Sequence, residues 1–191
     1  MIVGASLADA FASAPRRSEC WTRGTTVVAT REARIYTAFD GGELWAWGCL
    51  RRRGARAVPL DAVSRTNGAS DFRLAGTFAG YVGRGGGCAR GECTGDEVEV
   101  VDLRQRPRRI PGGVETTARS WLGRAFVLTP RAEVVLVRDD PAGAAVVVAH
   151  AVTGRVERTL DTGAIDPGSL ALSGSRVYWM NAGEPRTALL R

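Results

Sequence analysis

The side chains that could carry chemistry are few in this chain. His150 is the only histidine, so a Ser-His-Asp or Cys-His arrangement would have to include it. It lies in the valine-rich run Ala145–Val152, where we expect a packed strand residue rather than a catalytic base. The sequence contains no G-x-S-x-G motif, and it contains no lysine, so it cannot form a Walker A phosphate loop.

Carboxylates offer the alternative chemistry. Two carboxylates at a suitable distance can hydrolyse a glycosidic bond, and Asp139 with Asp140, or Asp161 with Asp166, are the candidate pairs. Aspartates next to Pro and Gly are also typical of tight turns, which is the interpretation we favour. The spacings of calcium loops and zinc sites are absent from the sequence. We therefore predict no catalytic residue, no metal and no cofactor, and keep a polysaccharide-directed hydrolase or lyase as the alternative.

Four cysteines, Cys20, Cys49, Cys88 and Cys93, form an even set. Cys88 and Cys93 lie in a glycine-rich loop between two expected strands and are close enough to form one disulfide, which leaves Cys20 and Cys49 for the other. The alternative is free thiols in a cytosolic protein.

The start of the chain indicates export. Met1–Ala14 is mildly apolar and ends in Ala-Ser-Ala, which is typical of a signal-peptide cleavage site. It lacks a basic start, so we read it as a truncated signal peptide, with a frayed terminus as the alternative. No run reaches the 18 apolar residues or so of a membrane span. Residues 1–23 are thus predicted to be a signal and N-terminal arm, and the protein is expected outside the cytoplasm.

The rest of the chain, residues 24–191, consists of short apolar runs separated by Gly, Pro and Asp, which is typical of an all-β protein with almost no helix. The runs recur in four repeats about one propeller blade in length. The expected strands are 25–30, 34–38, 43–50 and 56–60; 71–75, 77–82, 97–103 and 108–110; 125–129, 133–137, 145–152 and 156–160; and three more between Ser169 and Arg191. We expect residues 113–123 to be a loop. Several runs are apolar at consecutive positions, which predicts strands covered on both faces.

These repeats predict a small β-propeller-like array of four antiparallel blades. Its last blade has only three strands, so it is either incomplete or closed into a ring by residues near Trp21 to Arg23. An open solenoid or sandwich, or part of a larger propeller, is the rival architecture. Trp45 and Trp47 alternate onto one face, where we expect aromatic packing between blades rather than sugar stacking.

Two short segments resemble the propeller repeats of the YVTN and quinoprotein type, in which a strand ends in a D-x-x-T-G turn. Ala151-Val-Thr-Gly-Arg155 matches the Thr-Gly part, and Asp102-Leu-Arg-Gln-Arg106 matches the Asp part. The repeats are also similar to exported repeat proteins of high-GC actinobacteria. The resemblance implies a blade architecture and carries no activity with it.

Charge suggests a partner. The formal net charge is +6 and every cation is an arginine, which is typical of biased coding and makes nucleic acid an unlikely partner. In an antiparallel meander the turns after first and third strands lie at one end, and half of the 26 arginines fall there. The predicted binding residues are Arg51, Arg52, Arg53, Arg104, Arg106, Arg108 and Arg109. We expect a non-catalytic binding or scaffold module that docks on an anionic polymer, surface or protein through them.

Overall fold

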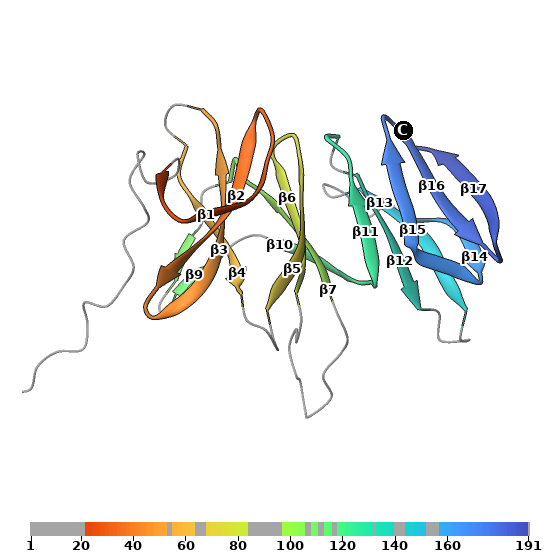
Figure 1. The fold of residues 1–191 in the computed structure, drawn as a ribbon, viewed down its shortest axis with the longest axis horizontal. Helices are drawn as coiled ribbons and strands as arrows, with labels where there is room; N and C mark the ends of the chain where they lie inside the picture. The colour runs from red at the N-terminus through yellow and green to blue at the C-terminus, as the bar shows by residue number, and fades with distance from the viewer. Residues whose placement is uncertain are drawn as a thin grey trace, which may run out of the picture.

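The structure of the chain is a computed structural model. It describes residues 22–52, 55–63, 68–83, 97–105, 108–110, 113–115, 118–131, 133–139, 144–151 and 157–190. Every element of regular secondary structure in this part of the chain is a β-strand, as the sequence predicted (Figure 1). They form four antiparallel sheets and one separate two-stranded ribbon.

The first sheet has the strand order β1–β2–β3–β4, from β1 (Thr25–Ala29), β2 (Ala33–Asp40), β3 (Glu43–Leu50) and β4 (Val58–Ala62). The second has the order β10–β7–β6–β5, from β5 (Ala69–Ala75), β6 (Phe78–Gly83), β7 (Glu97–Asp102) and β10 (Ala118–Leu122). The third has the order β11–β12–β13–β14, from β11 (Ala125–Leu128), β12 (Glu133–Asp139), β13 (Ala145–Ala151) and β14 (Glu157–Gly163). The fourth has the order β15–β16–β17, from β15 (Ile165–Ser173), β16 (Arg176–Asn181) and β17 (Glu184–Leu189).

The second sheet corrects one sequence prediction. Its outer strand is β10, which pairs with β7 from Ala118 opposite Val101 to Leu122 opposite Glu97. The expected strand β8 (Arg108–Ile110) instead pairs with β9 (Gly113–Glu115), inside the segment that we expected to be a loop. Three residues between Pro107 and Pro111 can form few ladder hydrogen bonds, because proline has no N–H to donate. The longer β10 matches almost the whole of β7.

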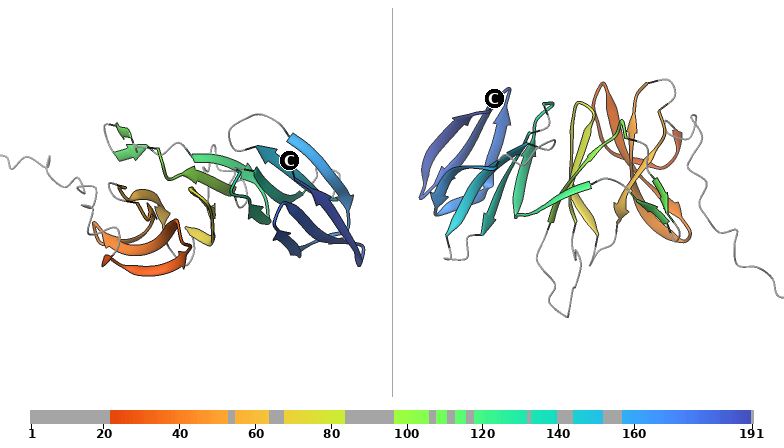
Figure 2. Two further views of the ribbon diagram at one scale, coloured as in Figure 1. Left: turned by 90° about the horizontal axis from the view of Figure 1, so that it is seen from above. Right: turned by 180° about the vertical axis from the view of Figure 1, so that it is seen from behind.

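The four sheets stand in a row, and the first and fourth sheets lie at its two ends (Figures 1 and 2). None of the sheets closes on itself. One of our two expectations for the last blade was that it closes a ring within this chain, and this expectation is wrong. Of the segment expected to close the ring, Trp21 lies outside the described residues, and Arg23 contacts the first sheet. Arg23 donates from Nη2 to the carbonyl of Phe39 at 3.1 Å, and its own carbonyl accepts a hydrogen bond from Arg34. The fourth sheet has three strands, as expected for an incomplete last repeat.

Apolar layers fill the spaces between neighbouring sheets. Ile35 and Leu60 of the first sheet pack with Tyr81 and Val101 of the second. The next layer joins the second and third sheets, and the last joins the third and fourth. Their buried members include Val98, Phe126, Val134 and Leu136 in the former and Val135, Val137, Val177 and Trp179 in the latter.

Strand β12 shows why apolar residues follow one another in this sequence. Val134 and Leu136 contact the second sheet, whereas Val135 and Val137 contact the fourth, and all four are fully buried. Alternate side chains of a strand point to opposite faces, so a sheet covered on both faces needs an unbroken apolar run. The sequence prediction of strands covered on both faces is confirmed here.

Glycines set how closely the sheets approach. A Cβ added to Gly80 would lie 2.6 Å from Cε2 of Phe126 in the third sheet, and one added to Gly48 would overlap Cδ2 of Leu103. Both approaches are far inside van der Waals contact. An aromatic ring and a leucine side chain therefore occupy the space that a larger residue at these positions would need.

Candidate binding surface

The turns that follow the first strand of each sheet lie on the same side of the row of sheets, at the upper end of the strands in Figure 1. A Cβ added to Gly76, in the turn between β5 and β6, would lie 3.6 Å from a carboxylate oxygen of Glu32 and 3.6 Å from Cβ of Pro130. Turns of the first, second and third sheets are therefore neighbours. Because consecutive strands run in opposite directions, the connections after third strands reach the same end.

Hydrogen bonds tie these later connections to the first turns. The amide of Arg51 donates to the carbonyl of Glu32 at 2.6 Å, and the amide of Leu103 donates to the carbonyl of Thr77 at 2.9 Å. In the fourth sheet the amide of Leu190 donates to the carbonyl of Ser175 at 2.7 Å. The same backbone contact thus recurs in three sheets. In each, it joins the connection after the third strand to the turn after the first strand.

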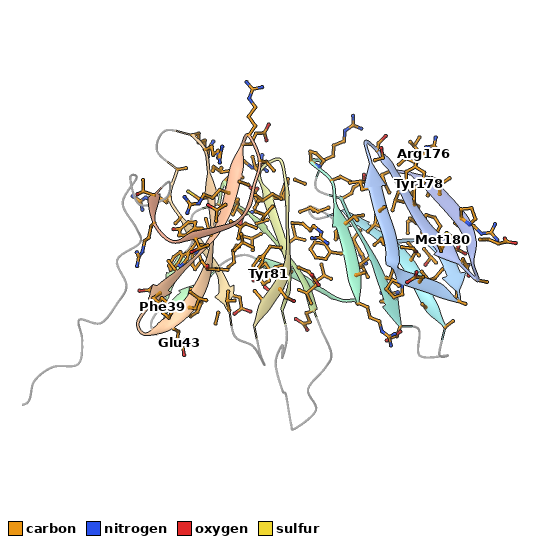
Figure 3. The ribbon with its side chains drawn as sticks, viewed as in Figure 1. Phe39, Glu43, Tyr81, Arg176, Tyr178 and Met180 are labelled. Carbon is orange, nitrogen blue, oxygen red and sulfur yellow. The ribbon has the colours of Figure 1, made fainter. Side chains whose placement is uncertain are left out.

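Arginines are concentrated on this end, which we call the basic end. Its exposed cations among the described residues are Arg31, Arg51, Arg52, Arg56, Arg104, Arg131 and Arg176. Its described carboxylates are Glu32, Asp102 and Glu133. Arg176 is labelled at this end in Figure 3, whereas Phe39 and Glu43 are labelled at the other.

The opposite end, which we call the acidic end, carries the reverse balance. Its described carboxylates, all exposed or half-buried, are Asp40, Glu43, Asp61, Asp71, Glu97, Asp139, Asp161, Asp166 and Glu184. The arginines described there are Arg23, Arg124, Arg138 and Arg186. The charges of the described residues are therefore polarised along the strands, so that they attract a polyanion at one end and repel it at the other.

One arginine of the basic end is held in a fixed geometry. Arg104 donates from Nε to Oδ1 of Asp102 at 2.9 Å and from Nη2 to Oδ2 at 2.7 Å, while its Cζ lies 5.5 Å from the ring centre of Phe78. Burial alone would raise the pKa of Asp102, but hydrogen bonds from Arg104 and the nearby charge of Arg52 hold it below its usual value. The carboxylate therefore pairs with Arg104 and is also stabilised by the charge of Arg52.

A cavity of about 350 Å³ opens between the third and fourth sheets at the basic end. It lies where the turn between β11 and β12 meets the turn between β15 and β16. Its lining residues are Thr129, Pro130, Arg131, Glu133, Gly174, Ser175 and Leu190. The charged side chains of its wall are one cation, Arg131, and one anion, Glu133.

The structure locates only some of the predicted site residues. Arg51, Arg52 and Arg104 lie exposed at the basic end. Arg108 and Arg109 belong to β8, which is described only in its backbone pairing. Arg53 and Arg106 lie outside the described residues. Binding through this set of arginines stays a prediction.

The other candidates are similarly divided. Asp139 is exposed and forms an ion pair with Arg124, with 2.6 Å between Oδ2 and Nη2, and Asp140 lies outside the described residues. Cys49 is buried in β3, whereas Cys20, Cys88 and Cys93 lie outside, so both disulfide pairings stay predictions. His150 is buried in β13, the strand position expected for it.

Trp47 of β3 bears on a smaller expectation, that the tryptophans of this strand pack between blades. Trp47 is buried with Tyr36 and Cys49 on the face of the first sheet that points away from the second. It is buried, and its neighbours in this cluster of described residues all belong to the first sheet and its connections.

A carboxyl pair that the sequence did not indicate lies between the first and second sheets, toward the acidic end. A Cβ added to Gly83 would lie 3.1 Å from Oε1 of Glu99 and 3.8 Å from Oδ2 of Asp61. The Tyr81 hydroxyl lies 2.7 Å from Oε2 of Glu99 and 2.9 Å from the carbonyl of Leu60. Burial raises the pKa of both carboxyl groups, and the charge of Asp61 raises that of Glu99 further. Asp61 and Glu99 are 38 positions apart, so spacing alone gave no signal.

The carboxylate of Asp161 joins the third and fourth sheets. It accepts hydrogen bonds from Nε1 of Trp179 at 2.8 Å and from Nδ2 of Asn181 at 3.0 Å, and Oδ1 accepts one from the amide of Thr162 at 2.9 Å. Burial alone would raise its pKa, but these donors together hold it below its usual value. These donors favour the ionised form of Asp161 and fix its position between the two sheets. Asp166, the other member of this candidate pair, accepts a hydrogen bond from the amide of Gly168, and a catalytic role for the pair stays a prediction.

Other classes of site find no support in the described part of the chain. It contains no group of three or more His, Cys, Asp or Glu side chains that could hold a metal ion. It also contains no helix long and apolar enough to cross a membrane.

Comparison with known proteins adds little. No family model matches the chain, and no curated protein matches it. Among solved structures, the apo form of the AtxE2 isopeptidase is similar to 83% of this chain with 12% sequence identity and a TM-score of 0.25. The chain spans 38% of the length of that isopeptidase. A likeness this slight carries no argument about fold or function.

Proposed function

We propose that the protein is a non-catalytic binding or scaffold module that docks on an anionic polymer or surface through its basic end. The observation that carries this proposal is the convergence of equivalent turns and third-strand connections on one end, together with the exposed arginines that they bear. A cluster of like charges on one face steers an oppositely charged partner to that face and orients it. Catalysis is not needed for such a role.

We further propose that the sheets are blades of a propeller-like array. Three features support this: the sheets are antiparallel meanders, they pack face to face in chain order, and their equivalent turns share one end. Repeat folds of this kind present their loops to ligands.

Export is part of the same proposal. An extracytoplasmic location would allow Cys20 to pair with Cys49 and Cys88 with Cys93. N-terminal sequencing of the native protein should then start after Ala14. An intact Met1 with titratable thiols would contradict it.

The test is binding of the full-length protein to heparin, a sulfated polysaccharide, at increasing salt. We expect affinity to fall steeply with salt, since exposed charges are screened beyond about 10 Å at 0.1 M. Arg52→Glu combined with Arg131→Glu should weaken binding about tenfold or more, because both arginines belong to the basic end.

A matched control separates location from net charge. Arg73→Glu combined with Arg186→Glu changes the net charge by the same amount, but these exposed arginines lie outside the basic end. This variant should bind nearly as well as the wild-type protein at physiological salt. Equal losses in the two double variants, or no binding by the wild-type protein, would contradict the proposed function.

The hydrolase or lyase alternative gains no specific observation. Asp139 is engaged with Arg124, and Asp161 with three donors. The alternative therefore stays a prediction from the sequence.

A further inference from the structure

We infer that Arg104 is the anchoring arginine of the basic end and that Asp102 is its positioning residue. This inference rests on the proposed function and names the chemistry of the ligand: a polysaccharide carrying oxyanion groups, such as sulfate or carboxylate. Arg104 would bind one such group in a bidentate manner, while the other arginines supply long-range attraction.

The first argument is the geometry of the guanidinium. It has two edges that can each donate a pair of parallel hydrogen bonds, one through Nε and Nη2 and the other through Nη1 and Nη2. Asp102 occupies the Nε edge, with Nε also 3.1 Å from Oδ2. No acceptor among the described residues forms a hydrogen bond with Nη1. The second edge is available to a ligand, and the side chain of Arg104 is half exposed.

The second argument is preorganisation. A surface arginine normally samples many rotamers, and immobilising it on binding costs free energy. Here the amide of Arg104 also donates to Oδ1 of Asp102 at 3.0 Å, and the Phe78 ring beneath the guanidinium is buried. The carboxylate of Asp102 is itself only 13% exposed. The guanidinium plane is therefore oriented before any ligand arrives.

The third argument concerns which polymer fits. Bases of single-stranded nucleic acids bind to exposed aromatic platforms. The exposed large apolar side chains of the described residues are Val27, Phe39, Tyr178 and Leu189, and none of the turns of the basic end contains an aromatic member of this set. Phe78 is covered by Arg104. A polymer whose recognisable groups are oxyanions, without bases to stack, is the better match.

The inference predicts an effect opposite to that of simple electrostatics. Asp102→Asn removes a negative charge from the basic end, which by charge alone should tighten binding to a polyanion. If Asp102 positions Arg104, the same substitution should instead weaken binding to heparin about fivefold, because a bidentate charge-assisted contact is disordered. Glu32→Gln removes one negative charge from the same end and should tighten binding about twofold. None of the ion pairs among the described residues involves Glu32.

Two further variants exclude a structural explanation. Arg104→Lys keeps the charge but cannot bind bidentately, so it should weaken binding about as much as Asp102→Asn. Arg186→Lys is the matched control, since Arg186 also pairs with a carboxylate two residues before it, Glu184, at 2.9 Å, but at the acidic end. It should leave heparin affinity unchanged. Circular dichroism at the assay temperature verifies that each variant is folded.

The experiment measures affinities of these full-length variants for heparin, which carries both sulfate and carboxylate groups, and for polygalacturonate, which carries carboxylates alone. Binding to heparin without binding to polygalacturonate indicates that sulfate is required. Weaker binding of Asp102→Asn and Arg104→Lys to at least one polymer, with tighter binding of Glu32→Gln, supports the inference. Tighter binding of Asp102→Asn, or wild-type affinity of Arg104→Lys, would overturn it while leaving the proposed function intact. No binding of the wild-type protein to either polymer would overturn both.

Discussion

The junction of the first and second sheets and the junction of the third and fourth sheets are built around the same pair of groups, an aromatic hydrogen-bond donor and a carboxyl. In the former, Tyr81 contacts Glu99. In the latter, Trp179 donates to Asp161. The two carboxyl groups nevertheless shift in opposite directions, since the pKa of Glu99 is raised and that of Asp161 is lowered.

The number of donors explains the difference. Asp161 accepts hydrogen bonds from Trp179, Asn181 and the amide of Thr162, and donors to the charged form stabilise that form. Glu99 has one aromatic partner and faces the carboxyl of Asp61.

Tyr81 also has only one hydroxyl proton for two acceptors, Leu60 and Glu99. Both contacts can be hydrogen bonds at once only when Glu99 is protonated and donates to the tyrosine oxygen. The same pair of groups is thus an ionised clasp at one junction and a proton-dependent contact at the other.

The largest effect should follow from removing the aromatic donor of the ionised clasp. Trp179→Ala empties a buried site between the third and fourth sheets and should lower the free energy of unfolding by about 3–5 kcal/mol. Trp179→Phe keeps most of the packing and removes the donor, so it should cost less. Urea denaturation of both variants checks this, and equal losses would mean that packing at this site counts for less than the hydrogen bond.

A smaller loss should follow from removing the charge of the clasp. Asp161→Asn should lower the free energy of unfolding by about 1–2 kcal/mol at pH 7, since the carboxylate is half exposed and its contacts are screened. The pKa of Asp161 is lowered in the fold, so this stability is present above the ordinary aspartate pKa and is lost as pH falls through the lowered value. Wild type and variant should therefore converge in strongly acidic solution. A difference that persists there would contradict an ionic origin.

The smallest effect has the opposite sign. Glu99→Gln should raise the free energy of unfolding by about 0.5–1 kcal/mol at pH 7, because it removes a partly buried charge that faces Asp61 and, more distantly, Glu97. Raised pKa values mean that the folded protein binds protons more readily. The contribution of Asp61 and Glu99 to stability should therefore rise as pH falls from neutral toward the ordinary pKa values near 4, and then level off.

Thermal melts of wild type and Glu99→Gln between pH 7 and pH 4 measure this. The variant should show a weaker rise, since Asp61 alone remains to titrate at the junction. A steeper rise in the variant than in the wild type would contradict the assignment.

The sequence by itself determined the class of fold and the polarity of the molecule. Short apolar runs such as Val134–Val137 require strands with two covered faces, and their boundaries follow from Gly, Pro and Asp at the turns. Once the strands form antiparallel meanders, the parity of each connection decides its end. Arginines that are far apart in the chain, such as Arg51 and Arg131, are therefore assigned to one end by the order of the strands alone.

Only the tertiary structure decided what depends on contacts between distant segments. It chose β10 over β8 as the partner of β7, because the longer strand matches the available edge. It placed Arg23 against the first sheet and the first and fourth sheets at opposite ends of the row. It also brought Asp61 against Glu99, and Asp161 against Trp179 and Asn181, and so gave two carboxyl groups opposite pKa shifts. A carboxyl group's pKa follows the donors and charges around it, and those neighbours are set by packing and not by sequence spacing.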